Sequence, residues 1–175
     1  MSERFAGEPG APTFIELDEA EYGHVWSRFD DLFGFRASTT AEGWPAIKEP
    51  SPSLTFDLSV IAEGAQRGAA YDAINAEALR AFVWALPDVE LWLALDWHHP
   101  AYWFRPTALA LTWQPVWTIP VYPDGDYFSF LVPDMTVGTF GHPWEQTLCV
   151  FGDALIESLG ASLATWLPTL RRHGA

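Results

Sequence analysis

The sequence predicts a single α+β domain with a mainly antiparallel sheet of about five strands and with N-terminal, middle and C-terminal helices. Apolar residues recur at helical spacing near the N-terminus, change to a period of two near Glu90, and return to helical spacing near Asp153. The chain has 175 residues, of which 49% are hydrophobic and 18% charged, so it can bury one sizeable core. The strands are not separated by helices in the alternating order that a dinucleotide-binding sheet requires.

The N-terminal region combines a flexible tail with the clearest helix signal. Residues 1–13 are predicted to be a tail, and residues 14–175 the domain. A helix is expected from about Asp18 to Phe33, because Asp18 can cap it and Glu21 completes a capping box. Gly34 is suited to end it.

Two further helices follow from apolar spacing. One is expected from about Asn75 to Leu86 and ends at Pro87. The other is expected from about Asp153 to Leu167, with these residues facing inward: Leu155, Ile156, Leu159, Leu163 and Trp166.

Alternating apolar residues predict the strands. A half-buried strand is expected near Leu54–Leu58, and Glu90–Trp97, apolar on both faces, is expected to lie centrally. Asp124-Gly125 predicts a hairpin between Trp113–Val121 and Asp126–Val132. That register pairs Val121 with Phe128, Ile119 with Phe130 and Trp117 with Val132. Two more strands are expected at 137–140 and 148–151, joined by a turn at 141–144.

Charge and aromatic content bear on partners. The formal net charge is −14, and no Lys or Arg lies between Arg105 and Arg171. Such a field repels phosphate backbones, so nucleic acid is not expected as a partner, whereas a basic protein or a cationic small molecule would be attracted. Ten tryptophans exceed what a core of this size needs, and Trp binds cations well.

The same composition bears on location. No apolar run approaches the length that spans a bilayer, and the N-terminal residues lack the apolar stretch of a secretory signal. The single cysteine, Cys149, fits a reducing compartment and a buried packing role. We therefore expect a cytoplasmic protein without membrane contact.

The segment LDWHHPAYWF contains the first group of candidate functional residues. If the strand persists to His99, then Asp96 and His98 share one face, while Trp97 and His99 share the other. An Asp that orients a His is half of a general-base arrangement. Trp103 closes this segment. The alternative is that the histidines only cap or flank the strand end.

The segment YPDGDY is the second group. Its Asp124 belongs to the predicted turn, whereas hairpin parity places Asp126 on an apolar face. A carboxylate there needs a donor or a cation, and His98 or Arg105 is the expected partner.

The segment GHPWE is the third group. A turn at Pro143 would present His142, Trp144 and Glu145 on a loop, as an acid–base or small-ligand site or simply as a packing turn. We expect no metal and no cofactor, because no spacing requires one.

Four motifs in order resemble the bacterial domain-of-unknown-function family 2716: WPAIKEP, ALDWHHPAYWF, YPDGDYFSFL and GHPWEQTLCVFG. The likeness spans about Glu19 to Leu159. It implies no catalytic residue, because none is assigned in that family. The small acidic α+β type is also similar to immunity-type proteins that neutralise bacterial toxins, although no motif supports that link.

Two functions remain open from the sequence. One is an acidic, Trp-bearing binding module for a basic protein or cationic partner, for example of immunity type. The other is a small-molecule enzyme or ligand-binding protein with a His/Asp/Glu/Trp pocket, for example in a biosynthetic pathway. In the second case His98, Asp126, His142 and Glu145 are the candidate catalytic residues. The candidate binding residues are Asp96, Trp97, His99, Trp103, Asp124 and Trp144. The riskiest expectation is that His98, Asp126 and His142 lie close together.

Overall fold

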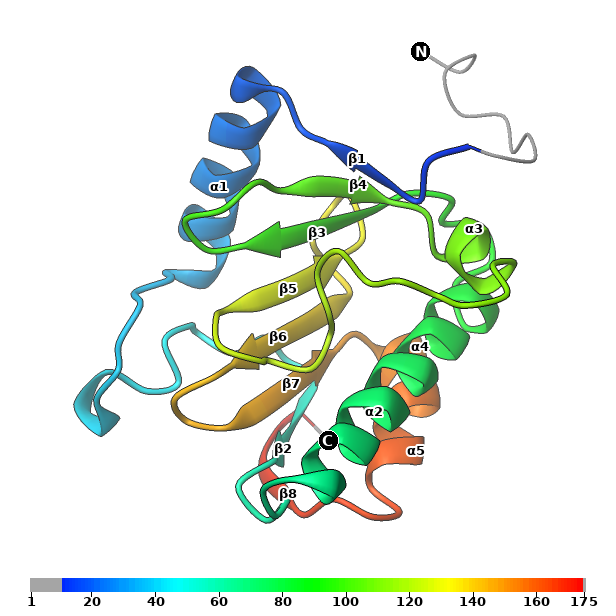
Figure 1. Cartoon of the computed structure of the whole chain (residues 1–175). Coiled ribbons are helices and arrows are strands. Elements are labelled where there is room, and N and C mark those ends of the chain that lie inside the picture. Colours follow the sequence, from blue (N-terminus) through cyan, green and yellow to red (C-terminus); the bar gives the residue numbers. More distant parts are fainter. Residues whose placement is uncertain (1–10, 175) are drawn as a thin grey trace.

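The computed structural model describes residues 11–174, and in this part of the chain eight strands form one antiparallel sheet (Figure 1). The order across the sheet is β1-β4-β3-β5-β6-β7-β2-β8. The strands are β1 (Phe14–Glu16), β2 (Ser53–Asp57), β3 (Trp92–Asp96), β4 (Tyr102–Phe104), β5 (Phe128–Leu131), β6 (Gly138–His142), β7 (Thr147–Phe151) and β8 (Thr169–His173). The α+β prediction is confirmed, but the sheet has eight strands instead of about five.

Helices cover both faces of the sheet. On one face α1 packs, and on the other lie α2, α3 and the C-terminal helical segment (Figure 1). The helices are α1 (Glu19–Phe33), η1 (Ala41–Gly43), α2 (Ala65–Trp84), α3 (Pro106–Ala110), α4 (Asp153–Leu155), the π-helical η2 (Ile156–Gly160) and α5 (Ala161–Leu163). Helices are therefore present at both ends and in the middle of the chain, as expected.

The first helix forms where its capping residues predict it. The Asp18 carboxylate accepts from the backbone N–H of Glu21 at 2.9 Å, and the Glu21 carboxylate accepts from the backbone N–H of Asp18 at 3.1 Å. Gly34 ends α1 in the left-handed conformation, which costs glycine little. Val25, Phe29 and Phe33 are the buried residues of this helix.

Two cores lie on the two faces of the sheet, because successive side chains of a strand point in opposite directions. In β3, Trp92 and Ala94 belong to the core under α2, while Leu93 and Leu95 belong to the core under α1. In β2 both faces are buried as well, since even Ser53 and Thr55 are almost inaccessible. The prediction of a half-buried strand there was wrong, because the face that carries the polar residues is covered too: Thr55 donates a hydrogen bond to the Glu49 carboxylate at 2.8 Å.

The predicted hairpin around Asp124-Gly125 does not exist. Residues 113–121 contain no strand, and β5 pairs with β3 and β6. Ile119, Val121 and Phe128 still meet in one core, so the pattern identified buried residues but not their pairing. The pairing failed because β5 pairs with β3, far back in the sequence, and with β6, which follows it, so the Asp124-Gly125 turn does not join two strands.

The predicted hairpin near residue 140 is confirmed. β6 and β7 pair antiparallel, with Phe140 opposite Cys149, and a short turn connects them. Cys149 is buried, as expected. β3 lies inside the sheet between β4 and β5, which agrees with its apolar residues on both faces.

The other two helical segments differ in detail from the predictions. α2 begins at Ala65, ten residues before the predicted start, because Ala70 and Ile74 also pack into the core. In the C-terminal segment Leu155, Leu159 and Leu163 are buried as expected. Trp166 does not face inward but is 43% exposed, because the helix has ended before it.

The N-terminal tail prediction falls mainly on residues 1–10, which lie outside the described residues. The predicted tail ends at Thr13, which is among the described residues. Its backbone carbonyl accepts from the backbone N–H of Arg105 at 2.8 Å, so the chain is already attached to the sheet there. Within residues 11–174, no helix is both long enough and apolar enough to cross a membrane.

Candidate functional site

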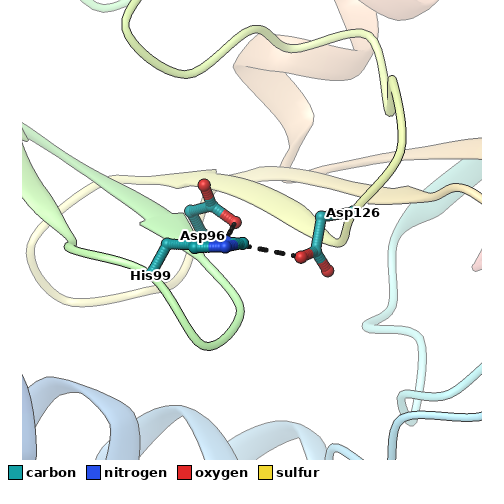
Figure 2. A group of neighbouring side chains, drawn as sticks. All are labelled: Asp96, His99 and Asp126. Carbon is teal, nitrogen blue, oxygen red and sulfur yellow. Dashed lines mark hydrogen bonds and ion pairs between the residues drawn. The ribbon is translucent and has the colours of Figure 1, made fainter.

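Asp96, His99 and Asp126 form a cluster where β3 ends and shortly before β5 begins, and Figure 2 shows the three side chains pointing toward one another. The Nδ1 atom of His99 lies 2.9 Å from Oδ1 of Asp96 and 3.5 Å from Oδ2 of Asp126. The second oxygen of Asp126 accepts from the backbone N–H of Tyr127 at 2.8 Å. The imidazole of His99 therefore contacts the carboxylates of both Asp96 and Asp126.

The electrostatics of this cluster favour a protonated His99. Burial raises the pKa of Asp96 above its usual value, and the negative charge of Asp126 adds to this, although the hydrogen bond with His99 opposes both. The hydrogen bond to Asp96, and then its charge, raise the pKa of His99. The ring of His99 remains more than half exposed, so the cluster lies open to solvent.

The pairing expected within this segment was wrong in detail. The strand ends at Asp96, and His98 adopts a left-handed backbone with φ of 64°, so the chain turns before His99. His99 therefore returns toward Asp96, while His98 is exposed and its ring lies over that of Trp97. The cation that meets Asp126 is likewise His99, where His98 or Arg105 was expected.

His142 is the last residue of β6 and is fully buried, which corrects its predicted position on an exposed loop. Its Nδ1 accepts from the backbone N–H of Glu145 at 3.0 Å, and its Nε2 lies 3.4 Å from the Tyr127 hydroxyl. Aromatic rings surround it, with Trp44 and Trp144 both placed edge-on. The strand continues to His142 because Thr147 pairs with it from β7.

This burial keeps His142 neutral. The pKa of His142 is lowered from its ordinary value to about 4, mainly by desolvation, which the charge of Glu145 partly offsets and the charge of Arg171 reinforces. A buried imidazole that accepts one hydrogen bond from the backbone acts as a packing residue of the turn. It has no contact with solvent through which it could exchange protons with a ligand.

Glu145 belongs to an ion-pair network that the sequence did not indicate. Arg171 of β8 donates to Glu145 at 2.6 and 2.9 Å and to Glu49 at 2.7 to 3.1 Å. Both carboxylates are almost completely buried. His173 and Thr55 complete the hydrogen bonds of Glu49, at 2.9 and 2.8 Å.

The network fixes the charges of its members. Burial alone would raise the pKa of Glu49, yet the hydrogen bonds from Arg171 and Thr55 outweigh it and hold that pKa below its usual value. Burial also opposes the charge of Arg171, but its two carboxylate partners raise its pKa. One feature of the sequence could have indicated the role of Arg171 in this network: it is the first Lys or Arg after Arg105.

The remaining candidate residues are distributed over the sheet. The ring centroid of Tyr127 lies 5.7 Å from that of Trp97 and 5.1 Å from that of Trp144. Its hydroxyl accepts from the backbone N–H of Ser38 and donates to the backbone carbonyl of the same residue. Trp103, on β4, donates to Glu21 at 3.3 Å. Since β3 and β5 lie between β4 and β6, Trp103 is not a neighbour of His142.

Two cavities among the described residues bear on the candidate residues. The larger, of about 700 Å³, lies along α2 and the segment after α3. The smaller, of about 250 Å³, includes the candidate residues Asp124 and Trp144. The cluster of Asp96, His99 and Asp126 lines neither of these two cavities, and His142 lines neither of them.

Asp96, His99 and Asp126 are also the residues that could hold a metal ion, since one potential ligand atom from each lies within 4.8 Å of the others. Carboxylate and imidazole ligands suit several divalent transition metals. The Nδ1 atom of His99 already lies 2.9 Å from the Asp96 carboxylate and 3.5 Å from that of Asp126, so this geometry does not require an ion.

Comparison with known proteins places the chain in a family. The model of a protein family of unknown function, DUF2716, matches residues 16–156. The chain belongs to the DUF2716 family. A relative within reach of sequence comparison is the uncharacterised protein YxiI of Bacillus subtilis (strain 168), 28% identical over 149 residues that cover 82% of this chain and 90% of that protein. No solved structure matches. The part of the chain that matches DUF2716 contains the Asp96 cluster and both walls of the larger cavity, but not Arg171.

Proposed function

We propose that the chain is a binding module for a cationic protein partner. The observation that carries this proposal is a set of large apolar side chains in water beside the larger cavity. Trp84 is 77% exposed and Trp113 is 95% exposed, and Leu111 and Val116 lie in the same segment as Trp113 and are exposed too. Large apolar side chains exposed in numbers beside a cavity are typical of an interaction site.

The charge of the protein supports a cationic partner. The formal net charge is −14, and several arginines are already engaged internally. Arg67 pairs with Glu63, Arg80 with Glu77, and Arg171 with two buried carboxylates. Because the chain has 23 acidic residues and nine basic ones, most carboxylates have no basic partner. The resulting negative field attracts cationic partners and increases their association rate.

The alternative, a small-molecule enzyme, has less support from the geometry. Asp96 and His99 form the orienting pair of a general base, but the ring of His99 is more than half exposed and neither residue lines either of the two cavities described above. An enzyme needs a concave site that excludes water around the reacting groups. The other two acid–base candidates, His142 and Glu145, have buried structural partners.

A selection from a random dodecapeptide display library tests the proposal. The full chain is immobilised and the selection is repeated at low and at physiological salt. We expect the enriched peptides to be rich in Lys and Arg, poor in Asp and Glu, and retained less well at higher salt. Enrichment of acidic peptides, or none at all, would refute a cationic partner.

A further inference from the structure

The larger cavity, of about 700 Å³, is a groove that runs along α2. One wall is the exposed side of α2, and the other is the segment that follows α3 and passes beside it (Figure 1). The larger apolar residues of the lining are Leu79, Val83, Trp84, Val116 and Trp117. The walls therefore offer an apolar slot bordered by two tryptophans.

The length of the groove suits a short peptide. Its lining on α2 extends from Tyr71 to Trp84. At 1.5 Å per residue this is about 20 Å. An extended chain advances about 3.3 Å per residue, so about six residues span the groove.

Asn75 places an unsatisfied donor in the lining. The residue is only 2% exposed, and its Oδ1 accepts from the backbone N–H groups of Val121 and Tyr122 at 2.7 and 3.2 Å. Its amino group has no hydrogen-bond partner among residues 11–174, although the Tyr71 hydroxyl is nearby. A buried donor without a partner costs about 1–3 kcal/mol, so an acceptor such as a peptide carbonyl would be favoured there.

The charges at the groove are net negative. Asp72 lines it, is exposed, and forms no ion pair with any other described residue. The cation in the lining, Arg80, is neutralised by Glu77, to which it donates twice at 3.0 Å. The segment that forms the other wall contains no Lys or Arg. A cation on the ligand therefore meets an unpaired carboxylate and no opposing charge.

We infer that this groove binds a short peptide segment of the partner protein that combines an aromatic or aliphatic anchor with Lys or Arg. The anchor packs between Trp84 and Trp117, a backbone carbonyl accepts from Asn75, and the cation faces Asp72. This inference rests on the proposed function and assigns it to one surface.

The test uses the peptides enriched in the display selection, synthesised with a fluorescent label and titrated with the full chain by anisotropy. Trp84→Ser should weaken binding about tenfold or more, since buried aromatic anchors dominate binding energy. Asp72→Asn should weaken it about two- to fivefold at low salt and less at high salt. Trp166→Ser and Asp31→Asn, exposed residues away from the groove, are the matched controls and should leave affinity unchanged.

The possible outcomes separate the inference from the function on which it rests. Cationic peptides that bind Trp84→Ser and Asp72→Asn as tightly as the natural chain would overturn the groove assignment and leave the binding module intact. A selection that enriches no cationic peptide would overturn both. Self-association that Trp84→Ser abolishes would assign the groove to a second copy of the chain, which also contradicts the inference. Unchanged thermal melting of each variant confirms that the fold is retained.

Discussion

The burial of His142 predicts that acid destabilises this protein well above the pH at which carboxylates are protonated. In the folded chain the pKa of His142 is about 4, against an ordinary value of 6.5. As the pH falls, the imidazole of residue 142 is therefore protonated in the unfolded chain before it is protonated in the folded chain. Stability from the neutral imidazole is fully present above pH 6.5 and is lost as the pH falls toward 4.

The magnitude follows from the difference between the two pKa values. A difference of about 2.5 units corresponds to about 3 kcal/mol over the whole range. Between pH 7 and pH 5 most of the change in the unfolded state has already occurred, so the loss is about 2 kcal/mol. This is a large fraction of the net stability of an ordinary domain.

Urea denaturation followed by tryptophan fluorescence at pH 7, 6 and 5 measures this loss. The natural chain should lose about 2 kcal/mol more than His142→Gln over that interval, because the variant has no imidazole to protonate. His99→Gln is the matched control with the opposite sign. The pKa of His99 is raised by Asp96, so its contribution is present at low pH and is lost as the pH rises.

Two results would show this reasoning to be wrong. One is a pair of stability curves, for the natural chain and His142→Gln, that run parallel within about 0.5 kcal/mol from pH 7 to pH 5. The other is an NMR titration of the folded protein that places the pKa of His142 near 6.5. Either result would mean that water reaches the imidazole, and that the turn after β6 is open.

Three other perturbations test the architecture. Arg171→Leu should cost about 3–5 kcal/mol in urea denaturation, because it leaves two buried carboxylates without their cation; equal loss in the exposed neighbour variant Arg172→Leu would contradict this. Asp18→Ala should cost about 1 kcal/mol and reduce hydrogen-exchange protection in the first turn of α1, and unchanged protection would argue against the capping box. Burial raises the pKa of Cys149 to about 12, so a disulfide reagent should label it only as fast as the chain unfolds, and rapid labelling of the native protein would refute its burial.

Local signals predicted the parts of the fold that local interactions determine. The capping box at Asp18 and the short connection between β6 and β7 each involve residues a few positions apart, and both predictions are confirmed. The strands that were missed, β1, β4 and β8, have three to five residues each, and β1 and β8 lie at the two edges of the sheet. β1 and β4 have three residues each, too few for a period to be recognised. The partners of the two edge strands, β4 for β1 and β2 for β8, lie far away in the sequence.

The candidate residues show the same division. The sequence identified Asp96, His99 and Asp126, but it could not show that the chain turns at His98, because the left-handed backbone there is a product of the surrounding structure. Glu49 meets Arg171 across 122 residues, and no pattern of spacing predicts such a contact. The burial of Asn75 could have been predicted, because this polar residue lies one helical turn before Leu79 and therefore on the same buried face of α2.

The edges of the sheet offer a different way to bind a peptide, by addition of a strand, and the structure argues against it for a cationic partner. β1 has three residues, too few for a strong backbone ladder. β8 carries the exposed Arg172, and a basic side chain on an edge strand opposes both strand addition and a partner of like charge. The groove along α2 has the reverse properties, with exposed tryptophan, an unsatisfied amide and an unpaired carboxylate. If a cationic peptide did bind β8, Arg172→Leu would strengthen its binding, whereas binding in the groove leaves that variant unaffected.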